Sequence, residues 1–201
     1  VMGATGKIGQ VLTEALLKRG HTGRAIGRAP SKLAGLRARG AQPYDAPFHD
    51  IAGLSKAFDG VSAAFTMIPP AYEADDYSAY QDKVGEATIT ALKWAKVPHV
   101  VALSSLGAQW PTGTGPITGL HRIAGLNVAH LRPGYFMENQ SWSLATIKQH
   151  GVNGSPIRGD VPVDMVATQD IGHNAAEMLL QLAFRDHSFA ELTGSRLYTL
   201  N

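Results

Sequence analysis

The sequence has no cysteine among its 201 residues. This absence excludes disulfide bonds, thiolate metal sites and cysteine nucleophiles. His99, His173 and His187 do not have the spacing of metal ligands, so we expect no metal site. The chain length favours one domain and allows a small appendage.

A strong excess of either charge is also missing. The formal net charge is +2 and no run of lysines or arginines stands out, which argues against a nucleic-acid partner. No apolar stretch is long enough to span a membrane, and no signal peptide is visible. We therefore expect no membrane partner and a cytoplasmic location.

A glycine-rich stretch stands at the start of the chain. Gly3, Gly6 and Gly9 are spaced three apart and run into an amphipathic segment that ends at Arg19 and Gly20. This pattern predicts a turn that opens a helix and lays a pyrophosphate against the helix N-terminus. One glycine permits the tight turn, the second admits phosphate oxygens, and the third lets the helix pack closely on the preceding strand.

Strands and helices alternate along the rest of the sequence, which predicts an α/β protein with a parallel sheet. The expected strands are 21–27, 41–44, 61–68, 97–103, 127–131 and 196–200, with an extended stretch at 161–166. After the first helix, the expected helices are 30–39, 51–58, 76–96 and 141–150, and Asp170 is the expected N-cap of the last one. Residues 132–139 are expected to form a turn, and 106–119 a loop.

Two expected segments are unusually short. Only Val1 and Met2 precede the glycine turn, where a buried strand of about five residues is normal. The stretch 120–126, ahead of the strand that begins at Asn127, is too short for a crossover helix. We expect the native chain to start several residues upstream, and residues to be absent between His121 and Gly125.

Acidic residues are missing between Glu14 and Asp45. In a dinucleotide-binding fold, an acidic side chain about 20 positions after the glycine turn binds the ribose 2′-hydroxyl of NAD. Arg24, Arg28 and Lys32 occupy this region instead, and a guanidinium suits a 2′-phosphate. These residues favour NADP(H) over NAD(H); the alternative is a group of solvated cations at the start of a helix.

Five stretches together resemble the NmrA-like branch of the atypical short-chain dehydrogenase/reductase superfamily. They are residues 3–9, Arg28 with Lys32, 104–108, 131–139 and 166–172. The resemblance implies a Rossmann-type doubly wound parallel sheet in an NAD(P)-binding domain, residues 1–134. It also implies a small C-terminal substrate-binding region that includes the last sheet elements, residues 135–201, and a chain that is truncated at its end.

The same resemblance implies which residues bind the cofactor. The glycine turn would contact the pyrophosphate, Arg28 and Lys32 the 2′-phosphate, and segment 67–69 the ribose and nicotinamide. Asp50 would lie near the adenine ring, although its simpler role is to cap the helix 51–58. The complete set of cofactor-binding candidates is Gly3, Thr5, Gly6, Lys7, Ile8, Gly9, Arg28, Lys32, Asp50, Met67, Ile68, Pro69 and Ser104.

Candidate catalytic and substrate-binding residues lie further along the chain. The resemblance places His121 near the nicotinamide, and Tyr135 and Phe136 in the wall of the substrate pocket. We take His121 and Tyr135 as the catalytic candidates, since an imidazole can donate a proton near neutral pH. The alternative for His121 is a solvent-facing loop residue. Ser104 either binds a ligand or satisfies local backbone groups, and Trp110 either lines the substrate pocket or simply packs.

One pair that is typical of the wider superfamily is missing. In Tyr-x-x-x-Lys, the lysine lowers the tyrosine pKa so that the phenol can pass a proton to a carbonyl oxygen. No tyrosine in this sequence is followed four residues later by lysine, and Tyr80 and Lys83 are three apart. Carbonyl reduction by that route is therefore disfavoured.

Two functions from different classes fit the sequence. The first is an NADPH-dependent oxidoreductase that passes hydride to a small planar acceptor such as a quinone or an azo compound, which needs little acid–base machinery. The second, implied by the family, is a non-catalytic NADP(H)-binding redox sensor that regulates a partner protein. An isomerase or reductase of a phenolic or sugar-derived compound stays open as a third alternative, and so does oligomer formation.

Overall fold

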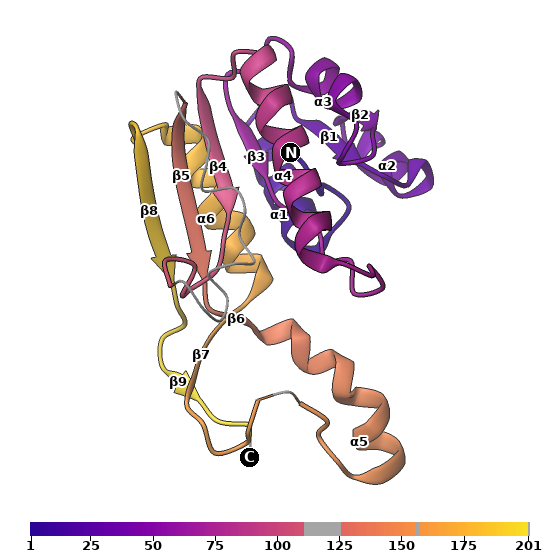
Figure 1. Cartoon of the computed structure of the whole chain (residues 1–201), viewed down its shortest axis with the longest axis vertical. Helices are drawn as coiled ribbons and strands as arrows, with labels where there is room; N and C mark the ends of the chain where they lie inside the picture. The colour runs from indigo at the N-terminus through magenta and orange to yellow at the C-terminus, as the bar shows by residue number, and fades with distance from the viewer. Residues whose placement is uncertain (111–125, 156, 201) are drawn as a thin grey trace.

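The computed structural model describes residues 1–110, 126–155 and 157–200. Its main body is a parallel sheet with helices on both faces, and a smaller lobe lies beyond the carboxyl ends of the strands (Figure 1). Among the described residues, no helix is both long and apolar enough to cross a bilayer.

Six strands of the main body pair in parallel, in two groups. One group joins two strands, β1 (Arg24–Gly27) and β2 (Gln42–Asp45). The other group has the order β3-β4-β5-β8 and consists of β3 (Ala64–Thr66), β4 (His99–Leu103), β5 (Asn127–Pro133) and β8 (His187–Leu192).

The first two residues of the chain connect these groups. The Met2 N–H donates to the Phe65 carbonyl on β3 at 2.9 Å, and the Ile26 N–H on β1 donates to the Val1 carbonyl at 2.9 Å. Met2 thus holds the place of the strand that was expected before the glycine turn, although it forms only an isolated parallel bridge with Ile26. The resulting spatial order, β2-β1-Met2-β3-β4-β5-β8, is that of a Rossmann-type sheet.

Helices cover both faces of this sheet because the strand side chains alternate between two apolar cores. One core joins Val100 and Ala102 of β4 to two helices, α3 (Ile51–Phe58) and α4 (Tyr77–Trp94). The other joins Val101 to α1 (Lys7–Lys18) and α6 (Thr168–Gln181). A smaller core packs α2 (Pro30–Arg37) near β1. The arrangement is doubly wound, as expected.

The lobe follows the carboxyl end of β5, toward which the arrowheads of β4, β5 and β8 point (Figure 1). We define it by its elements, which are β6 (Tyr135–Phe136), the 3₁₀ helix η3 (Met137–Ser143), α5 (Leu144–His150), β7 (Val163–Val166) and β9 (Leu197–Tyr198). β6 pairs in parallel with β7, and β7 pairs antiparallel with β9. Ligands of open α/β sheets bind outside the carboxyl ends of the strands, so the lobe stands where a substrate region is useful.

Several expected boundaries were wrong. The strand expected over 21–27 begins only at Arg24, and the apolar run 61–68 contributes only Ala64–Thr66. The turn expected at 132–139 instead contains the end of β5, then β6, then the start of η3. β8 was not expected at all, because it is an edge strand with an exposed face and no apolar alternation. The shortened crossover at 120–126 and the expected loop beyond 110 lie mostly outside the described residues.

The expected cap of the last helix was also wrong. α6 begins at Thr168 with Ala167 at its N-cap position, and Asp170 lies within the first turn. An alanine offers no side-chain acceptor to the free N–H groups of the first turn. Another part of the chain supplies that acceptor, as described below.

Candidate active site

A cleft of about 510 Å³ runs along the carboxyl edge of the sheet between the main body and the lobe. We call it the carboxyl-edge cleft. Its lining comes from the glycine turn, the ends of β3 and β4, the start of α4, and the lobe. The lining residues are Gly3, Gly6, Lys7, Ile8, Gly9, Phe65, Met67, Ile68, Pro70, Tyr72, Tyr77, Gln81, Leu103, Ser104, Ser105, Phe136, Glu138, Asn139, Trp142 and Thr168.

The glycine turn forms one end of the cleft, and two of its glycines are required by geometry. Gly3 has a φ of +70°, and a Cβ there would lie 2.9 Å from the Met67 sulfur. A Cβ on Gly9 would lie 2.2 Å from the Gly3 carbonyl oxygen, so the helix could not approach the turn as closely. These are the two roles that the spacing predicted for the first and third glycines.

The N-terminus of α1 opens into the same end of the cleft. Gly6 is its N-cap residue and has no side-chain acceptor, and the first turn contains no acidic residue. The first N–H groups of a helix lack partners within it, and the helix dipole favours an anion there. Lys7 adds a positive charge at the first helical position. This combination fits the pyrophosphate of a dinucleotide.

Two cations follow β1, as the sequence predicted. Arg28 is exposed and its guanidinium carbon lies 5.5 Å from the centre of the Phe48 ring, while Lys32 is exposed on the first turn of α2. Within the described part of the chain, neither side chain forms an ion pair. Arg24 has a different role, because its guanidinium donates to the carbonyl oxygens of Ala57 and Asp59 at 3.0 and 2.5 Å. It ties β1 to the end of α3 and is removed from the set of candidate phosphate ligands.

Asp50 acts as the N-cap of α3, the simpler of its two expected roles. Its carboxylate accepts a hydrogen bond from the Ala52 N–H at 3.1 Å. Thr5 does not line the carboxyl-edge cleft. Its methyl group faces β1, where a Cβ on Gly27 would lie 3.4 Å away. Contacts of these two residues with a cofactor remain predictions.

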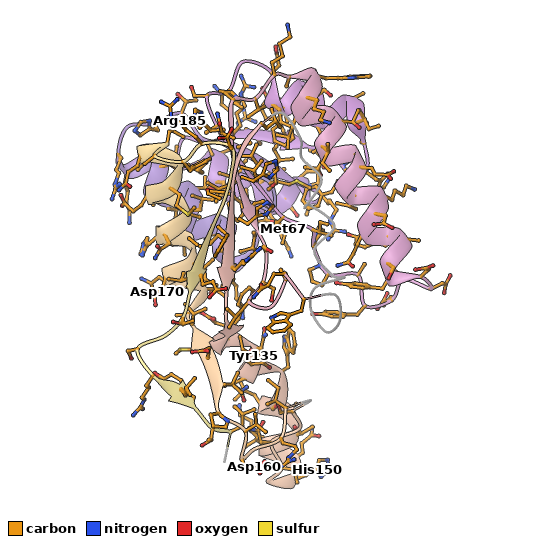
Figure 2. The ribbon with its side chains drawn as sticks, turned by 60° about the vertical axis from the view of Figure 1, so that its left-hand side comes forward. Met67, Tyr135, His150, Asp160, Asp170 and Arg185 are labelled. Carbon is orange, nitrogen blue, oxygen red and sulfur yellow. The ribbon has the colours of Figure 1, made fainter. Side chains whose placement is uncertain are left out.

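The end of β3 supplies an apolar floor for the cleft. Met67 touches both main cores and lies within the main body, above the lobe (Figure 2). Met67 and Ile68 line the cleft, but Pro69 is buried and the next residue, Pro70, lines it instead. Two of the three residues predicted to face the nicotinamide, Met67 and Ile68, therefore line the cleft, and Pro70 takes the place of Pro69.

Ser104 brings a hydrogen-bonding group to this apolar region. Its backbone N–H donates to the Leu131 carbonyl at 2.8 Å, which fixes it at the end of β4. Its hydroxyl is buried and has no hydrogen-bond partner among the residues that the structure describes. A buried hydroxyl without a partner costs free energy unless a ligand or water satisfies it. The hydroxyl therefore does not satisfy a local backbone group, and its contact with a ligand stays a prediction.

Glu138 joins the lobe to the main body. Its carboxylate accepts hydrogen bonds from the Thr168 N–H at 2.9 and 3.0 Å and from the Thr168 hydroxyl at 2.6 Å. Glu138 thus caps α6, because Ala167, the N-cap residue of that helix, has no side-chain acceptor. Burial pushes the pKa of Glu138 upward, but the hydrogen bonds from Thr168 and the charge of Lys7 outweigh it, so the pKa falls below its usual value of 4.5.

Tyr77 lines the cleft from the first residue of α4. Burial is the main cause that raises its pKa above the usual 10.0, and Tyr72 and Tyr80 add to the effect. The phenol thus stays protonated near neutral pH. This shift is opposite to the one that the lysine of a Tyr-x-x-x-Lys pair produces, so Tyr77 does not replace that pair.

The remaining catalytic and substrate-binding candidates differ in whether they line the cleft. Phe136 lines the cleft, whereas Tyr135 precedes it on β6 and does not. Successive side chains of a strand point to opposite sides, which explains the difference; Figure 2 shows Tyr135 where the lobe begins. Trp110 is 63% exposed and is not part of the cleft. His121 lies outside the described residues.

Several cleft residues were missed by the sequence analysis. Trp142, Tyr72, Gln81 and Tyr77 belong to no recognised motif. Glu138 stood within the family stretch 131–139 but received no role. Of these residues, only Glu138 could have been recognised from the sequence. A carboxylate can cap a helix, and Glu138 begins no predicted helix of its own, so it was a candidate for capping a helix elsewhere in the chain.

The residues present fit a bound dinucleotide. Gly3, Gly6 and Gly9 carry no side chain that would crowd a ligand, and the first turn of α1 has no acidic residue. The buried Ser104 hydroxyl has no hydrogen-bond partner among the described residues. A family model described as NAD(P)H-binding matches residues 3–124, more than half of the chain. The chain belongs to this family.

Named relatives of the chain are reductases. It is 29% identical to (4-alkanoyl-5-oxo-2,5-dihydrofuran-3-yl)methyl phosphate reductase of Streptomyces griseus, over 94% of this chain and 66% of the relative. It is 26% identical to the NAD(P)H azoreductase of Xenophilus azovorans, over 94% of this chain and 65% of the relative. The chain thus spans slightly less than two thirds of the length of these two proteins.

A solved structure confirms the fold class. The NADPH-dependent quinone oxidoreductase of Escherichia coli, crystallised with NADPH, superposes with a TM-score of 0.82 at 27% identity. The match covers 99% of this chain and 70% of that one. The interpretation of the sequence as an NAD(P)-binding Rossmann-type protein is therefore confirmed.

Glu138→Gln tests the contact between lobe and main body. The amide keeps the shape but loses the negative charge that Thr168 and Lys7 stabilise, so we expect a loss of about 1–2 kcal/mol in the free energy of unfolding near neutral pH. Since the folded-state pKa is depressed, this contribution is present above the unfolded-state pKa and is lost as the pH falls through the folded-state value. Denaturant titrations from about pH 3 to 8 measure the difference between variant and wild type.

Glu86→Gln, on the exposed face of α4, is the matched control. It removes the same charge without touching the lobe and is expected to change stability by less than about 0.5 kcal/mol. A Glu138→Gln deficit that is equal at about pH 3 and pH 7 would show that the carboxylate charge contributes nothing.

Proposed function

We propose that this protein is an NADPH-dependent oxidoreductase that transfers hydride to a small planar acceptor, such as a quinone or an azo compound. One observation carries the proposal: a single cleft joins the glycine turn to an apolar and aromatic wall. The named reductase relatives support it. A regulatory role has no comparable support.

The chain's own residues have separate tasks in this reaction. The N-terminus of α1 and Lys7 hold the pyrophosphate, and Arg28 with Lys32 hold the 2′-phosphate. The reduced nicotinamide, when bound, supplies the hydride. Ser104 offers a hydrogen bond to the nicotinamide amide or to the acceptor at the end of β4. Met67 and Phe136 keep the surroundings apolar.

The chemistry balances without a strong protein acid. A quinone gains a hydride and one proton to become a hydroquinone, while NADPH becomes NADP⁺; an azo compound gains the same two to become a hydrazo compound. A quinone accepts hydride readily, and water can supply the proton. Ketone reduction by the Tyr-x-x-x-Lys route needs an activated phenol, and burial raises the pKa of Tyr77, so Tyr77 does not supply one.

Turnover with defined acceptors tests the proposal. The oxidation of NADPH is followed by absorbance with menadione, with an azo dye and with cyclohexanone. We expect saturable oxidation with menadione or the dye and none with cyclohexanone. Oxidation that occurs with the ketone alone, or with none of the three, would contradict the proposed acceptor class.

Arg28→Ala tests the choice of coenzyme. Loss of a charge-assisted contact with the 2′-phosphate is expected to weaken NADPH binding by about 10- to 100-fold, while NADH binding changes by less than about twofold. Nicotinamide fluorescence measures both dissociation constants. Arg37→Ala, an exposed arginine in the last turn of α2, is the control for a general loss of positive charge. Equal weakening of NADPH and NADH would refute the assignment of Arg28.

A further inference from the structure

Two aromatic side chains meet at the rim of the carboxyl-edge cleft from opposite sides. Tyr72 comes from the segment between β3 and α4, and Trp142 comes from η3 in the lobe. Their ring centres are 6.2 Å apart and their planes cross at 83°, so one ring meets the other edge to face. Both side chains line the cleft.

Most of each ring surface is open to solvent. Tyr72 is 76% exposed and Trp142 is 61% exposed. Single exposed aromatic residues are common on protein surfaces and need no explanation. This pair is different, because the two rings touch each other and line the same cleft as the glycine turn. Their free faces are available to a flat ligand.

The backbone on both sides of Trp142 is anchored, although its ring is exposed. Glu138, in the same 3₁₀ helix, accepts hydrogen bonds from Thr168 of the main body. Ser143, the next residue after Trp142, is buried, and its hydroxyl donates to the Gly154 carbonyl at 2.6 Å. The backbone that carries the indole is therefore fixed before any ligand arrives, which lowers the entropic cost of binding.

Tyr72 is restrained by its neighbours in sequence. Pro69 and Pro70 end the segment after β3 and fix two backbone φ angles shortly before it. The Asp76 carboxylate, which accepts from the Ala79 N–H at 2.9 Å, then fixes the start of α4. A short segment held at both ends presents the tyrosine ring at the rim.

The geometry of the pair defines how a ligand can bind. A flat ring between two parallel rings needs them about 7 Å apart and face to face, since stacked rings lie about 3.5 Å from each other. Rings that cross at 83° offer no such slot. They offer a corner, in which a ligand that stacks on the face of one ring points its own edge at the face of the other. A larger flat ligand covers more of that corner.

We propose that Tyr72 and Trp142 form an aromatic clamp that selects acceptors with fused, flat rings over acceptors with a single ring. The inference rests on the proposed function, because it concerns the acceptor end of the same cleft. It adds the class of acceptor and the two residues that determine it.

Steady-state kinetics with two quinones tests the clamp. Menadione has two fused rings, and benzoquinone has one. In Trp142→Ala we expect the KM for menadione to rise about tenfold and the KM for benzoquinone to rise less than about threefold, with NADPH affinity unchanged. Tyr72→Ala shifts the ratio of the two KM values in the same direction, and Trp142→Phe restores most of the menadione KM because it keeps a flat ring.

Trp94→Ala is the matched control. Trp94 is 70% exposed at the end of α4 and does not line the cleft. It should leave both KM values unchanged. If Trp142→Ala changes the two KM values by the same factor, or changes neither, the clamp does not select acceptors and the inference is overturned.

A binding measurement separates the clamp from the proposed function. One variant keeps only Trp142 (Trp94→Phe with Trp110→Phe), and another keeps only Trp94 (Trp110→Phe with Trp142→Phe). With NADP⁺ present and no turnover, menadione should quench Trp142 fluorescence saturably and Trp94 fluorescence only in proportion to its concentration. Proportional quenching in both variants overturns the clamp. Saturable quenching of Trp142 without NADPH oxidation by any quinone or azo dye supports the clamp and contradicts the proposed function.

Discussion

The pairing of Val1 and Met2 between two groups of strands is the constraint on which the other features depend. Hydrogen bonds from Met2 to Phe65 and from Ile26 to Val1 place this short segment at the centre of the sheet. The chain must then turn sharply at Gly3, and α1 begins at the carboxyl edge of the sheet. The free N–H groups of α1, the end of β3 and the end of β4 meet there for that reason.

The capping of α6 by Glu138 is a second constraint. It places the lobe residues that line the carboxyl-edge cleft opposite the main body. α6 packs against α1 on one face of the sheet, so its N-terminus has a fixed position in the main body. Glu138 binds that N-terminus and carries with it η3, including Trp142. The lobe is thus tied to the main body by a hydrogen-bonded carboxylate. The residues that we propose to face an acceptor are attached to this contact, whose strength depends on the charge of the carboxylate.

Sequence patterns predicted what is local and failed where partners are distant. The glycine spacing identified the turn and α1, and Asp50 was identified as a cap, because both depend on neighbours within a few residues. β8 was missed because an exposed edge strand needs no apolar alternation, and its pairing with β5 joins segments far apart in the chain. The meeting of Tyr72 with Trp142 was equally hidden, since it depends on how the lobe folds back toward the main body.

Binding of NADPH to wild type and to Gly6→Asp, followed by nicotinamide fluorescence, tests the central claim most directly. Gly6 has φ −82° and ψ 169° at the N-cap of α1, a conformation that suits aspartate. A carboxylate there caps the helix and repels a pyrophosphate at the same place. The account predicts a variant that unfolds at the same or a higher denaturant concentration yet binds NADPH at least about 100-fold more weakly. A stable variant that binds NADPH as tightly as the wild type would show that the cofactor does not lie at this helix N-terminus.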